Sequence, residues 1–265
     1  MSDVLLSADE ISIVFGGLRA VSSFSCELKV GELVGLIGPN GAGKTTVFNM
    51  LSGVYSPTEG TICFTDSRGK THNAHTMKPY QLSKAGIART FQNIRLFGSL
   101  TVEDNVLIAM HAQRQITPLD AIYRTPRFYR DEERLRARTQ ELLALFRIDS
   151  KKHELASNLP YGEQRKLEIV RALATNPRLL LLDEPAAGMN PQETHELMEL
   201  IAFIRKQFNL TILLIEHDMK LVMGICERLI VLDYGRTIAS GLPQEIKENP
   251  AVIKAYLGEE AMIDA

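Results

Sequence analysis

The chain has 265 residues, of which 45% are hydrophobic and 23% are charged, so it is long enough to bury a sizeable core. Its 30 basic residues nearly balance its 32 acidic residues, and the net charge of −2 gives no overall attraction to nucleic acid or anionic lipid. A partner of either kind would need a local basic patch. The composition excludes the disordered, collagen-like and disulfide-scaffold classes of protein.

The longest apolar runs are short, such as Leu179 to Leu182, and none approaches the roughly 20 residues of a membrane helix. The first residues lack a basic region followed by an apolar one, so we expect no signal peptide. Cys26, Cys63 and Cys226 are far apart and not in CxxC spacing. They indicate reduced structural thiols of a cytosolic protein; a metal site or a catalytic thiol is the less favoured alternative.

The N-terminal part of the chain has the pattern of short strands. Residues 1–35 alternate between apolar and polar side chains, with a turn expected at Gly16 and Gly17. The apolar run from Leu33 to Ile37 predicts a buried strand. The stretch from Thr45 to Leu51 has the composition of a helix, and turn residues divide 56–75 into strands.

The middle of the chain changes character. From about Glu103 to Glu154 it is charged and poor in β-branched residues, which predicts a helical subdomain with a loop near 115–128, where two prolines lie. Acids and bases alternate from Arg130 to Arg138. This run is interpreted as a solvated helix face, and nucleic-acid binding is the weaker interpretation.

After residue 160 predicted helices and strands alternate. Helices are expected over 162–175, 191–208 and 220–226, and strands over 179–182, 211–215 and 229–232. This alternation predicts an α/β fold with a mostly parallel sheet.

A glycine-rich loop follows the first buried strand and matches the pattern G-x-x-x-x-G-K-[ST]. Its residues are Gly38, Pro39, Asn40, Gly41, Ala42, Gly43, Lys44 and Thr45. Glycines let backbone N–H groups turn toward a triphosphate, and the N-terminus of the next helix attracts the same charge. Lys44 would reach the β- and γ-phosphates of the triphosphate, and the Thr45 hydroxyl would bind Mg²⁺. Thr46, the next residue, is expected to bind the nucleotide as well. The alternative is a glycine-rich turn with a solvated lysine.

Two carboxylates end the predicted strand 179–182. Ligands of such sheets bind at the carboxyl ends of the strands. Asp183 is placed to hold Mg²⁺, directly or through water, and Glu184 to act as the general base on an attacking water. Alone, the pair would be interpreted equally well as a helix cap, but the glycine-rich loop favours catalysis.

The segment Leu159 to Glu168 contains Tyr161, Gly162 and Glu163 at an expected helix start. With the glycine-rich loop and the acidic pair, it resembles the ATP-binding cassette family, whose signature is Leu-Ser-Gly-Gly-Gln before a basic helix. The resemblance implies a head-to-tail dimer with ATP between the phosphate loop of one cassette and the signature of the other. Amides near Gly162 would then face the γ-phosphate. An unrelated helix start is the alternative.

Further family positions follow from the resemblance. Gln92 matches the glutamine that faces Mg²⁺ and the attacking water, and His217 matches the histidine that contacts the γ-phosphate. The implied catalytic set is Glu184, His217 and Gln92, and the implied metal set is Thr45, Gln92 and Asp183. Phe15 stands where the family stacks an aromatic ring on adenine, with a core phenylalanine as the alternative. The segment 186–190 occupies the D-loop.

The sequence departs from the family pattern at three positions. Pro160 replaces the signature serine and has no N–H to offer, Tyr161 replaces a glycine, and Asn190 replaces the usual aspartate. These put the serine and aspartate roles in doubt. With these departures, the sequence resembles the ATPase components of bacterial branched-chain amino acid importers. The resemblance lies in the segments 159–165, 183–191 and 215–223. The ATPase of lipopolysaccharide export is the nearest alternative.

The resemblance covers about 5–258 and implies a P-loop fold with a mostly parallel core sheet, an N-terminal antiparallel β part and an inserted α-helical subdomain. The implied core is 1–92 with 160–258, the Q-loop and helical subdomain are about 93–159, and 259–265 is a tail. Permease helices would dock near 94–97, although Leu96 and Phe97 could equally be core.

The implied partners are a second cassette, two membrane permeases and, indirectly, an external binding protein, with no nucleic acid. The implied location is the cytoplasmic face of the bacterial inner membrane. Alternatives are a non-transport cassette acting on ribosomes or DNA, and a nucleotide switch. A ribosomal cassette protein would carry a second cassette, and a DNA-acting one a long coiled-coil insertion; neither pattern is seen in this sequence. A nucleotide switch is disfavoured because Glu184, the expected general base, is retained.

Overall fold

The computed structural model describes residues 4–114 and 116–263. Its contacts divide the chain into two compact units, one that ends at Gln92 and resumes at Arg178, and one from Asn93 to Pro177. The stretch 160–177, which the sequence analysis groups with the core, clusters with the helical unit. The reason is that α6 (Tyr161–Leu173) packs against α3 (Val102–Ala109) and α5 (Pro126–Leu145).

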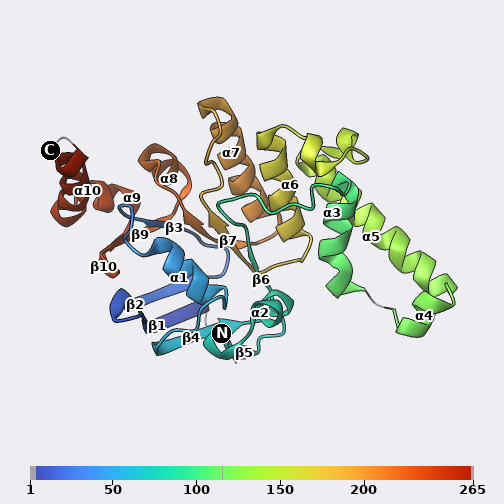
Figure 1. Cartoon of the computed structure of the whole chain (residues 1–265), viewed down its shortest axis with the longest axis horizontal. Coiled ribbons are helices and arrows are strands. Elements are labelled where there is room, and N and C mark those ends of the chain that lie inside the picture. Colours follow the sequence, from blue (N-terminus) through green and yellow to red (C-terminus); the bar gives the residue numbers. More distant parts are fainter. Residues whose placement is uncertain (1–3, 115, 264–265) are drawn as a thin grey trace. The chain divides into compact units, whose positions relative to one another are not determined.

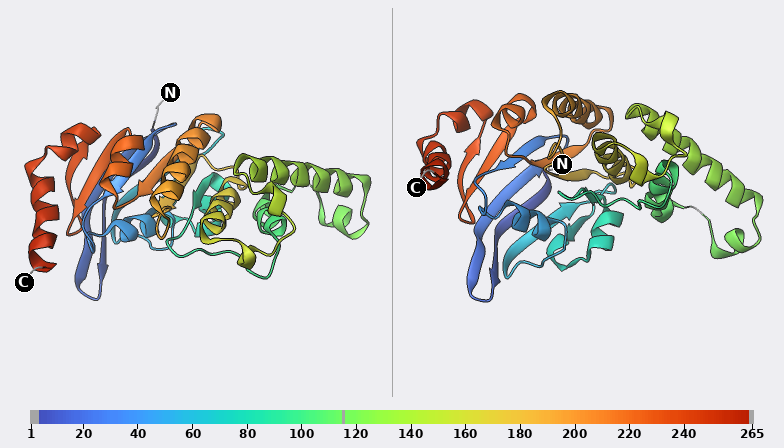
Figure 2. Two further views of the ribbon diagram at one scale, coloured as in Figure 1. Left: turned by 90° about the horizontal axis from the view of Figure 1, so that it is seen from above. Right: turned by 45° about the horizontal axis from the view of Figure 1, so that its top comes forward.

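The first unit contains a four-stranded sheet of order β2-β1-β4-β5. Its strands are β1 (Val4–Phe15), β2 (Leu18–Lys29), β4 (Glu59–Thr65) and β5 (Thr71–Asn73). All of its pairings are antiparallel. β1 and β2 form a long hairpin that turns at Gly16 and Gly17, as the alternating sequence predicts (Figure 2).

A six-stranded sheet of order β10-β9-β3-β8-β7-β6 completes the β structure of this unit. Its strands are β3 (Leu33–Ile37), β6 (Ile87–Arg89), β7 (Leu179–Asp183), β8 (Thr211–Ile215), β9 (Arg228–Asp233) and β10 (Arg236–Gly241). Only β10 runs antiparallel to its neighbour. β3, β7 and β8 are buried throughout, which explains why they are apolar runs rather than alternating sequences.

Helices cover both faces of the six-stranded sheet (Figure 1). The helices of this unit are α1 (Lys44–Leu51), α2 (Pro79–Ala85), α7 (Pro191–Gln207), α8 (Met219–Ile225), α9 (Pro243–Lys247) and α10 (Pro250–Ile263), with a 3-10 turn at Ala74–Thr76. α1 contacts both β2 and β7, so it lies between the two sheets. Its Val47, Phe48 and Leu51 belong to the core cluster there. α10 contacts β10 at the sheet edge (Figure 2); residues 264–265 of the expected tail lie outside the described residues.

The second unit is helical, as expected. Besides α3, α5 and α6 it contains α4 (Pro118–Ile122) and 3-10 turns at Met110–Gln113, Asp149–Lys151 and Ala156–Asn158. Leu135, Leu142 and Phe146 are buried, and Leu145 is half-buried. The unit thus has its own core.

The prediction of a loop at 115–128 is wrong, because α4 lies within this range and α5 begins at Pro126. Both prolines occupy the first turn of a helix, where their missing N–H costs nothing. Thr117 and Asp120 form a capping box that starts α4. A proline therefore marks a helix start here rather than a loop.

All three cysteines are free thiols. Burial raises the pKa of Cys26 and of Cys226 to about 12, so both stay protonated at neutral pH. They behave as small apolar core residues.

Phe48 tests the packing of α1 between the sheets. Phe48→Ala should lower the free energy of unfolding by about 3–5 kcal/mol, because the fully buried ring leaves a cavity. Urea unfolding measures this change. Phe203→Ala is the matched control, since Phe203 is about half exposed on α7, and it should change stability far less. Equal effects of the two substitutions would contradict this packing.

Candidate functional site

The glycine-rich loop joins β3 to α1 and is held from two sides. Gly38 has a φ of +146°, and a Cβ there would lie 2.0 Å from the carbonyl oxygen of Leu232 on β9. Gly43 has a φ of +100°, and its Cβ would lie 2.9 Å from the carbonyl oxygen of Ala20 on β2. Only glycine fits either position, and this close packing sets the path of the loop.

Lys44 crosses back over the loop that precedes it. Its ammonium donates to the carbonyl oxygens of Gly38, at 2.6 Å, and Pro39, at 2.8 Å. The side chain is buried, whereas Thr45 beside it is exposed and Thr46 is half-buried at the start of α1. A buried cation and the first turn of a helix therefore lie together at the end of β3, an arrangement that suits phosphate.

One side of the loop lines a pocket of about 430 Å³. Its walls come from Pro39, Asn40, Gly41 and Ala42, from the β9–β10 turn, and from α10. Tyr234 and Lys254 lie in this wall, and the sequence analysis missed both. They stand about 200 residues from the loop in the sequence, and no motif marks them.

Asp183 ends β7 and is buried, with 3% of its surface exposed. Arg89, at the end of the adjacent strand β6, donates to its Oδ2 at 2.9 Å. The same guanidinium donates to Asn49 and Ser52 at the C-terminal end of α1. Arg89 therefore compensates the buried charge and ties β7 to α1, a role that the sequence analysis missed.

Glu184 follows Asp183 and takes a left-handed backbone conformation with φ of 44°. This conformation is strained for a residue with a side chain, and such strain is often kept where it serves a site. The amide of Glu184 donates to Ile215, and its carbonyl accepts from Ala187. These bonds stabilise the strained turn after β7.

The three residues predicted to be catalytic lie together around this turn. The amide of Gln92 donates to Oε2 of Glu184 at 2.9 Å. Nδ1 of His217 lies 4.0 Å from the same oxygen. Gln92 and His217 are exposed, so the carboxylate stands between two polar groups that face solvent. Such a carboxylate can accept a proton from a water held beside it.

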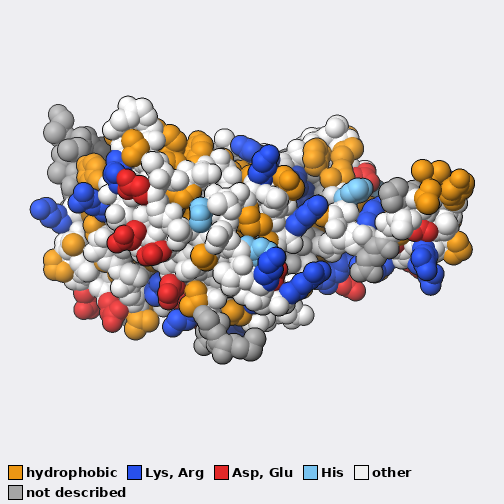
Figure 3. Space-filling model, turned by 90° about the horizontal axis from the view of Figure 1, so that it is seen from below, with side chains coloured by type: hydrophobic (Ala, Val, Ile, Leu, Met, Phe, Trp, Pro, Cys, Tyr) orange, Lys and Arg blue, Asp and Glu red, His pale blue; other side chains and the backbone are white. Residues whose placement is uncertain are grey.

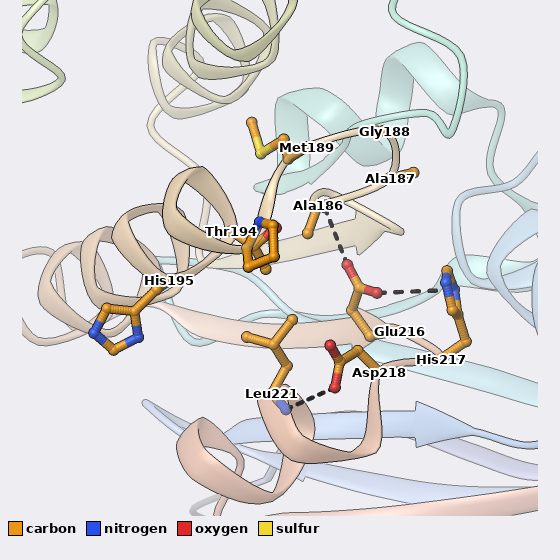
Figure 4. Close-up of a pocket in the computed structure, with 11 residues that line it drawn as sticks. Ala186, Ala187, Gly188, Met189, Thr194, His195, Glu216, His217, Asp218 and Leu221 are labelled. Carbon is orange, nitrogen blue, oxygen red and sulfur yellow. Dashed lines mark hydrogen bonds and ion pairs between the residues drawn. The ribbon is translucent and has the colours of Figure 1, made fainter.

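Glu216 precedes His217 and was not predicted to matter. Its buried carboxylate accepts from the backbone N–H of Ala186 at 3.0 Å and lies 4.0 Å from Nδ1 of His217 (Figure 4). Burial raises the pKa of this carboxyl. A pocket of about 510 Å³ opens here between the segment 186–189 and α8. Glu216 thus links the D-loop segment to the histidine.

Phe15 ends β1 and pairs in register with Leu18 across the hairpin turn. Its ring is 43% exposed and meets the ring of Tyr55 edge-on, with 5.2 Å between the centroids. The same hairpin packs on the phosphate loop through Ala20. The alternative of a buried core phenylalanine is therefore wrong, and an exposed ring is available for stacking.

The signature residues lie in the second unit, at the start of α6. Tyr161 is exposed, and its hydroxyl accepts from Arg165 at 3.4 Å. Gly162 follows in the first turn, and Glu163 pairs with Lys151 at 2.7 Å. Pro160 is the residue before this helix. A helix therefore begins where the sequence predicts one.

Comparison with known proteins identifies the family. A family model described as "ABC transporter" matches residues 21–187. The chain belongs to the ABC transporter family. A second model, described as "Branched-chain amino acid ATP-binding cassette transporter", matches residues 236–262. ABC ATP-binding proteins hydrolyse ATP, so this chain is an ATPase.

Individual relatives cover nearly the whole chain. It is 48% identical over 259 residues to the high-affinity branched-chain amino acid transport ATP-binding protein LivG of Escherichia coli strain K12, covering 98% of this chain and 100% of that protein. It is 31% identical over 255 residues to the lipopolysaccharide export system ATP-binding protein LptB of the same strain, covering 96% and 98%.

A solved ABC cassette has a similar structure. The ADP conformation of MJ1267, an ATP-binding cassette of an ABC transporter, matches with a TM-score of 0.81 and 28% identity, covering 97% of this chain and 100% of that one. The resemblance stated from the sequence and the P-loop α/β fold are confirmed. The roles of individual site residues stay predictions.

The ion pair of Arg89 and Asp183 gives a test of this edge of the ABC core. Arg89→Ala should lower the free energy of unfolding by about 3–5 kcal/mol, because Asp183 loses the cation beside its buried charge. Chemical unfolding at neutral pH measures the loss. The control is Arg19→Ala, whose pair with Glu59 is about half exposed, and it should have a far smaller effect. A smaller loss for Arg89 than for Arg19 would contradict this assignment.

Proposed function

We propose that this ATPase powers the uptake of branched-chain amino acids through separate membrane permeases. The observation that carries the substrate class is the match of residues 236–262 to the branched-chain amino acid cassette model. The higher identity to LivG than to LptB supports the same choice over lipopolysaccharide export.

The hydrolysis step is assigned to the residues around the end of β7. Glu184 takes the proton of an attacking water, Gln92 orients that water, and His217 contacts the γ-phosphate. The 2.9 Å bond from Gln92 to Glu184 and the 4.0 Å separation from His217 support a shared site. The strained φ of Glu184 agrees with this assignment, because such strain is often kept at functional sites.

Nucleotide binding is assigned to the phosphate loop and the β1–β2 hairpin. Lys44 and the first turn of α1 neutralise the phosphates, and Phe15 stacks on the adenine. The buried ammonium of Lys44 and the exposed ring of Phe15 support this assignment. Tyr161, Gly162 and Glu163 of a second cassette complete the site from the opposite side.

The oxygen-bearing side chains Thr45, Gln92 and Asp183 are assigned to Mg²⁺. They suit this hard cation, which keeps several waters and takes few protein ligands. Mg²⁺ would neutralise charge on the phosphates during hydrolysis.

The assembly proposed is two cassettes with two permeases and an external binding protein, placed at the cytoplasmic face of the inner membrane. In the described part of the chain, no helix has the length and apolar character needed to cross a bilayer. The membrane pathway is therefore assigned to the permeases.

Glu184→Gln tests the general base. The substitution should lower kcat about 10²–10⁴-fold, because the amide cannot take the proton, while ATP binding is retained. Phosphate release and nucleotide titration measure the two effects. The control is Glu199→Gln on the exposed face of α7, which should leave kcat unchanged. Hydrolysis by Glu184→Gln at the wild-type rate would refute the assignment.

Ligand-stimulated hydrolysis tests the substrate class. In the complete transporter reconstituted with its binding protein, leucine, isoleucine or valine should raise the ATPase rate, because transport of the amino acid would be coupled to ATP hydrolysis. Lysine and glutamate serve as controls and should leave the basal rate unchanged. Stimulation by charged amino acids alone would overturn the proposed substrate while leaving the ATPase assignment intact.

A further inference from the structure

The helical unit carries an exposed apolar cluster that the proposed function does not use. The cluster consists of Leu119 and Ile122 on α4, Tyr123 just after it, and Tyr129 in the first turn of α5; we call it the α4 tip. These side chains are 63%, 72%, 75% and 56% exposed. Figure 1 shows α4 at one end of the long helix α5, and Figure 3 shows hydrophobic side chains gathered at that end.

Basic residues surround the α4 tip. Between residues 114 and 130 the sequence holds four arginines and one aspartate, in a chain whose net charge is −2. The four arginines are Arg114, Arg124, Arg127 and Arg130. Arg124, Arg127 and Arg130 are exposed. The α4 tip is therefore the kind of local basic patch that the whole-chain charge does not provide.

The one acid of this segment is engaged within it. The carboxylate of Asp120 accepts from the amide and the hydroxyl of Thr117 and from the hydroxyl of Thr125. These bonds hold the pKa of Asp120 below its usual value, so the carboxylate stays ionised but is occupied in capping α4. Three more acids, Asp131 to Glu133, follow on α5, where Asp131 pairs with Arg134 and Glu132 lies 3.6 Å from Arg136. The exposed arginines of the tip segment therefore still exceed its own acid.

The α4 tip is folded, so its apolar side chains are presented by a regular element. The backbone N–H of Tyr123 donates to the carbonyl oxygen of Leu119 at 3.0 Å, and that of Thr125 donates to the carbonyl oxygen of Asp120 at 3.1 Å. In the first turn of α5, Phe128 meets Tyr129 edge-on at 5.5 Å. A folded element does not need to be ordered when it binds, which lowers the cost of contact.

We propose that the α4 tip contacts the anionic headgroups of a lipid bilayer. Leucine, isoleucine and tyrosine side chains would enter the interfacial layer, and the arginines would pair with lipid phosphates. The inference rests on the proposed function in one respect, that the assembly works beside a membrane. Few side chains take part, so the contact is weak and reversible, and it orients a subunit that the permeases hold.

The charge of the tip favours lipid as the occupant. Three exposed arginines beside bulky, exposed apolar side chains complement an anionic layer with an apolar interior.

Vesicle co-sedimentation of the purified full chain tests the proposal. Vesicles of phosphatidylcholine with phosphatidylglycerol should bind the chain, and vesicles of phosphatidylcholine alone should bind it at least tenfold more weakly. Ile122→Asp should reduce binding about tenfold, and Arg124→Gln about fivefold. Leu242→Asp is the matched control, because Leu242 is 58% exposed in the other unit, and it should bind as the unchanged chain does.

Three results would overturn the proposal: no binding to either vesicle, equal binding to both, or equal losses for Leu242→Asp and Ile122→Asp. If Ile122→Asp weakened assembly with the permeases while vesicle binding was absent or unchanged, the α4 tip would be a protein contact instead. ATPase activity should be the same in all these variants, since none lies in the nucleotide site. If the unchanged chain did not bind vesicles, the proposed lipid contact would be wrong, but the proposed transport function would not be affected. If the chain had no ATPase activity, the transport function would be wrong, but the lipid contact would not be affected.

Discussion

Parallel pairing of the core strands is the constraint on which the site depends. β3, β8 and β7 run in the same direction in consecutive register, so their carboxyl ends meet at one edge of the sheet. The phosphate loop leaves β3, Glu184 leaves β7 and His217 leaves β8 at that edge. Residues separated by more than 170 positions in the sequence therefore become neighbours through the backbone alone.

Two buried polar side chains link the strand ends at this edge to neighbouring elements by hydrogen bonds. Arg89 joins β6 to β7 and to the end of α1, while Glu216 joins β8 to the segment after Glu184. Each bond links a strand end to an element that carries a candidate site residue. A shift in one of them is therefore transmitted to its neighbour, because buried hydrogen-bonding groups cannot lose their partners cheaply.

The regular elements and most of the candidate site could be predicted because their signals are local. β3, β8 and α7 are marked by apolar runs or periodicity, and the phosphate loop by its spacing. α4 was missed because Pro118 indicates both a break and a helix start. The bond of Arg89 to Asp183 could not be predicted because the two residues are far apart in the sequence. Lys254 lines a pocket with residues distant in the chain, and no local pattern marks it.

The bonds from Lys44 to the carbonyls of Gly38 and Pro39 have a consequence for ligand affinity. Lys44 stabilises the conformation of the phosphate loop by these hydrogen bonds. The glycines of the loop therefore lose their conformational freedom when the protein folds rather than when a ligand binds. Binding energy is then available for recognition instead of for ordering the loop.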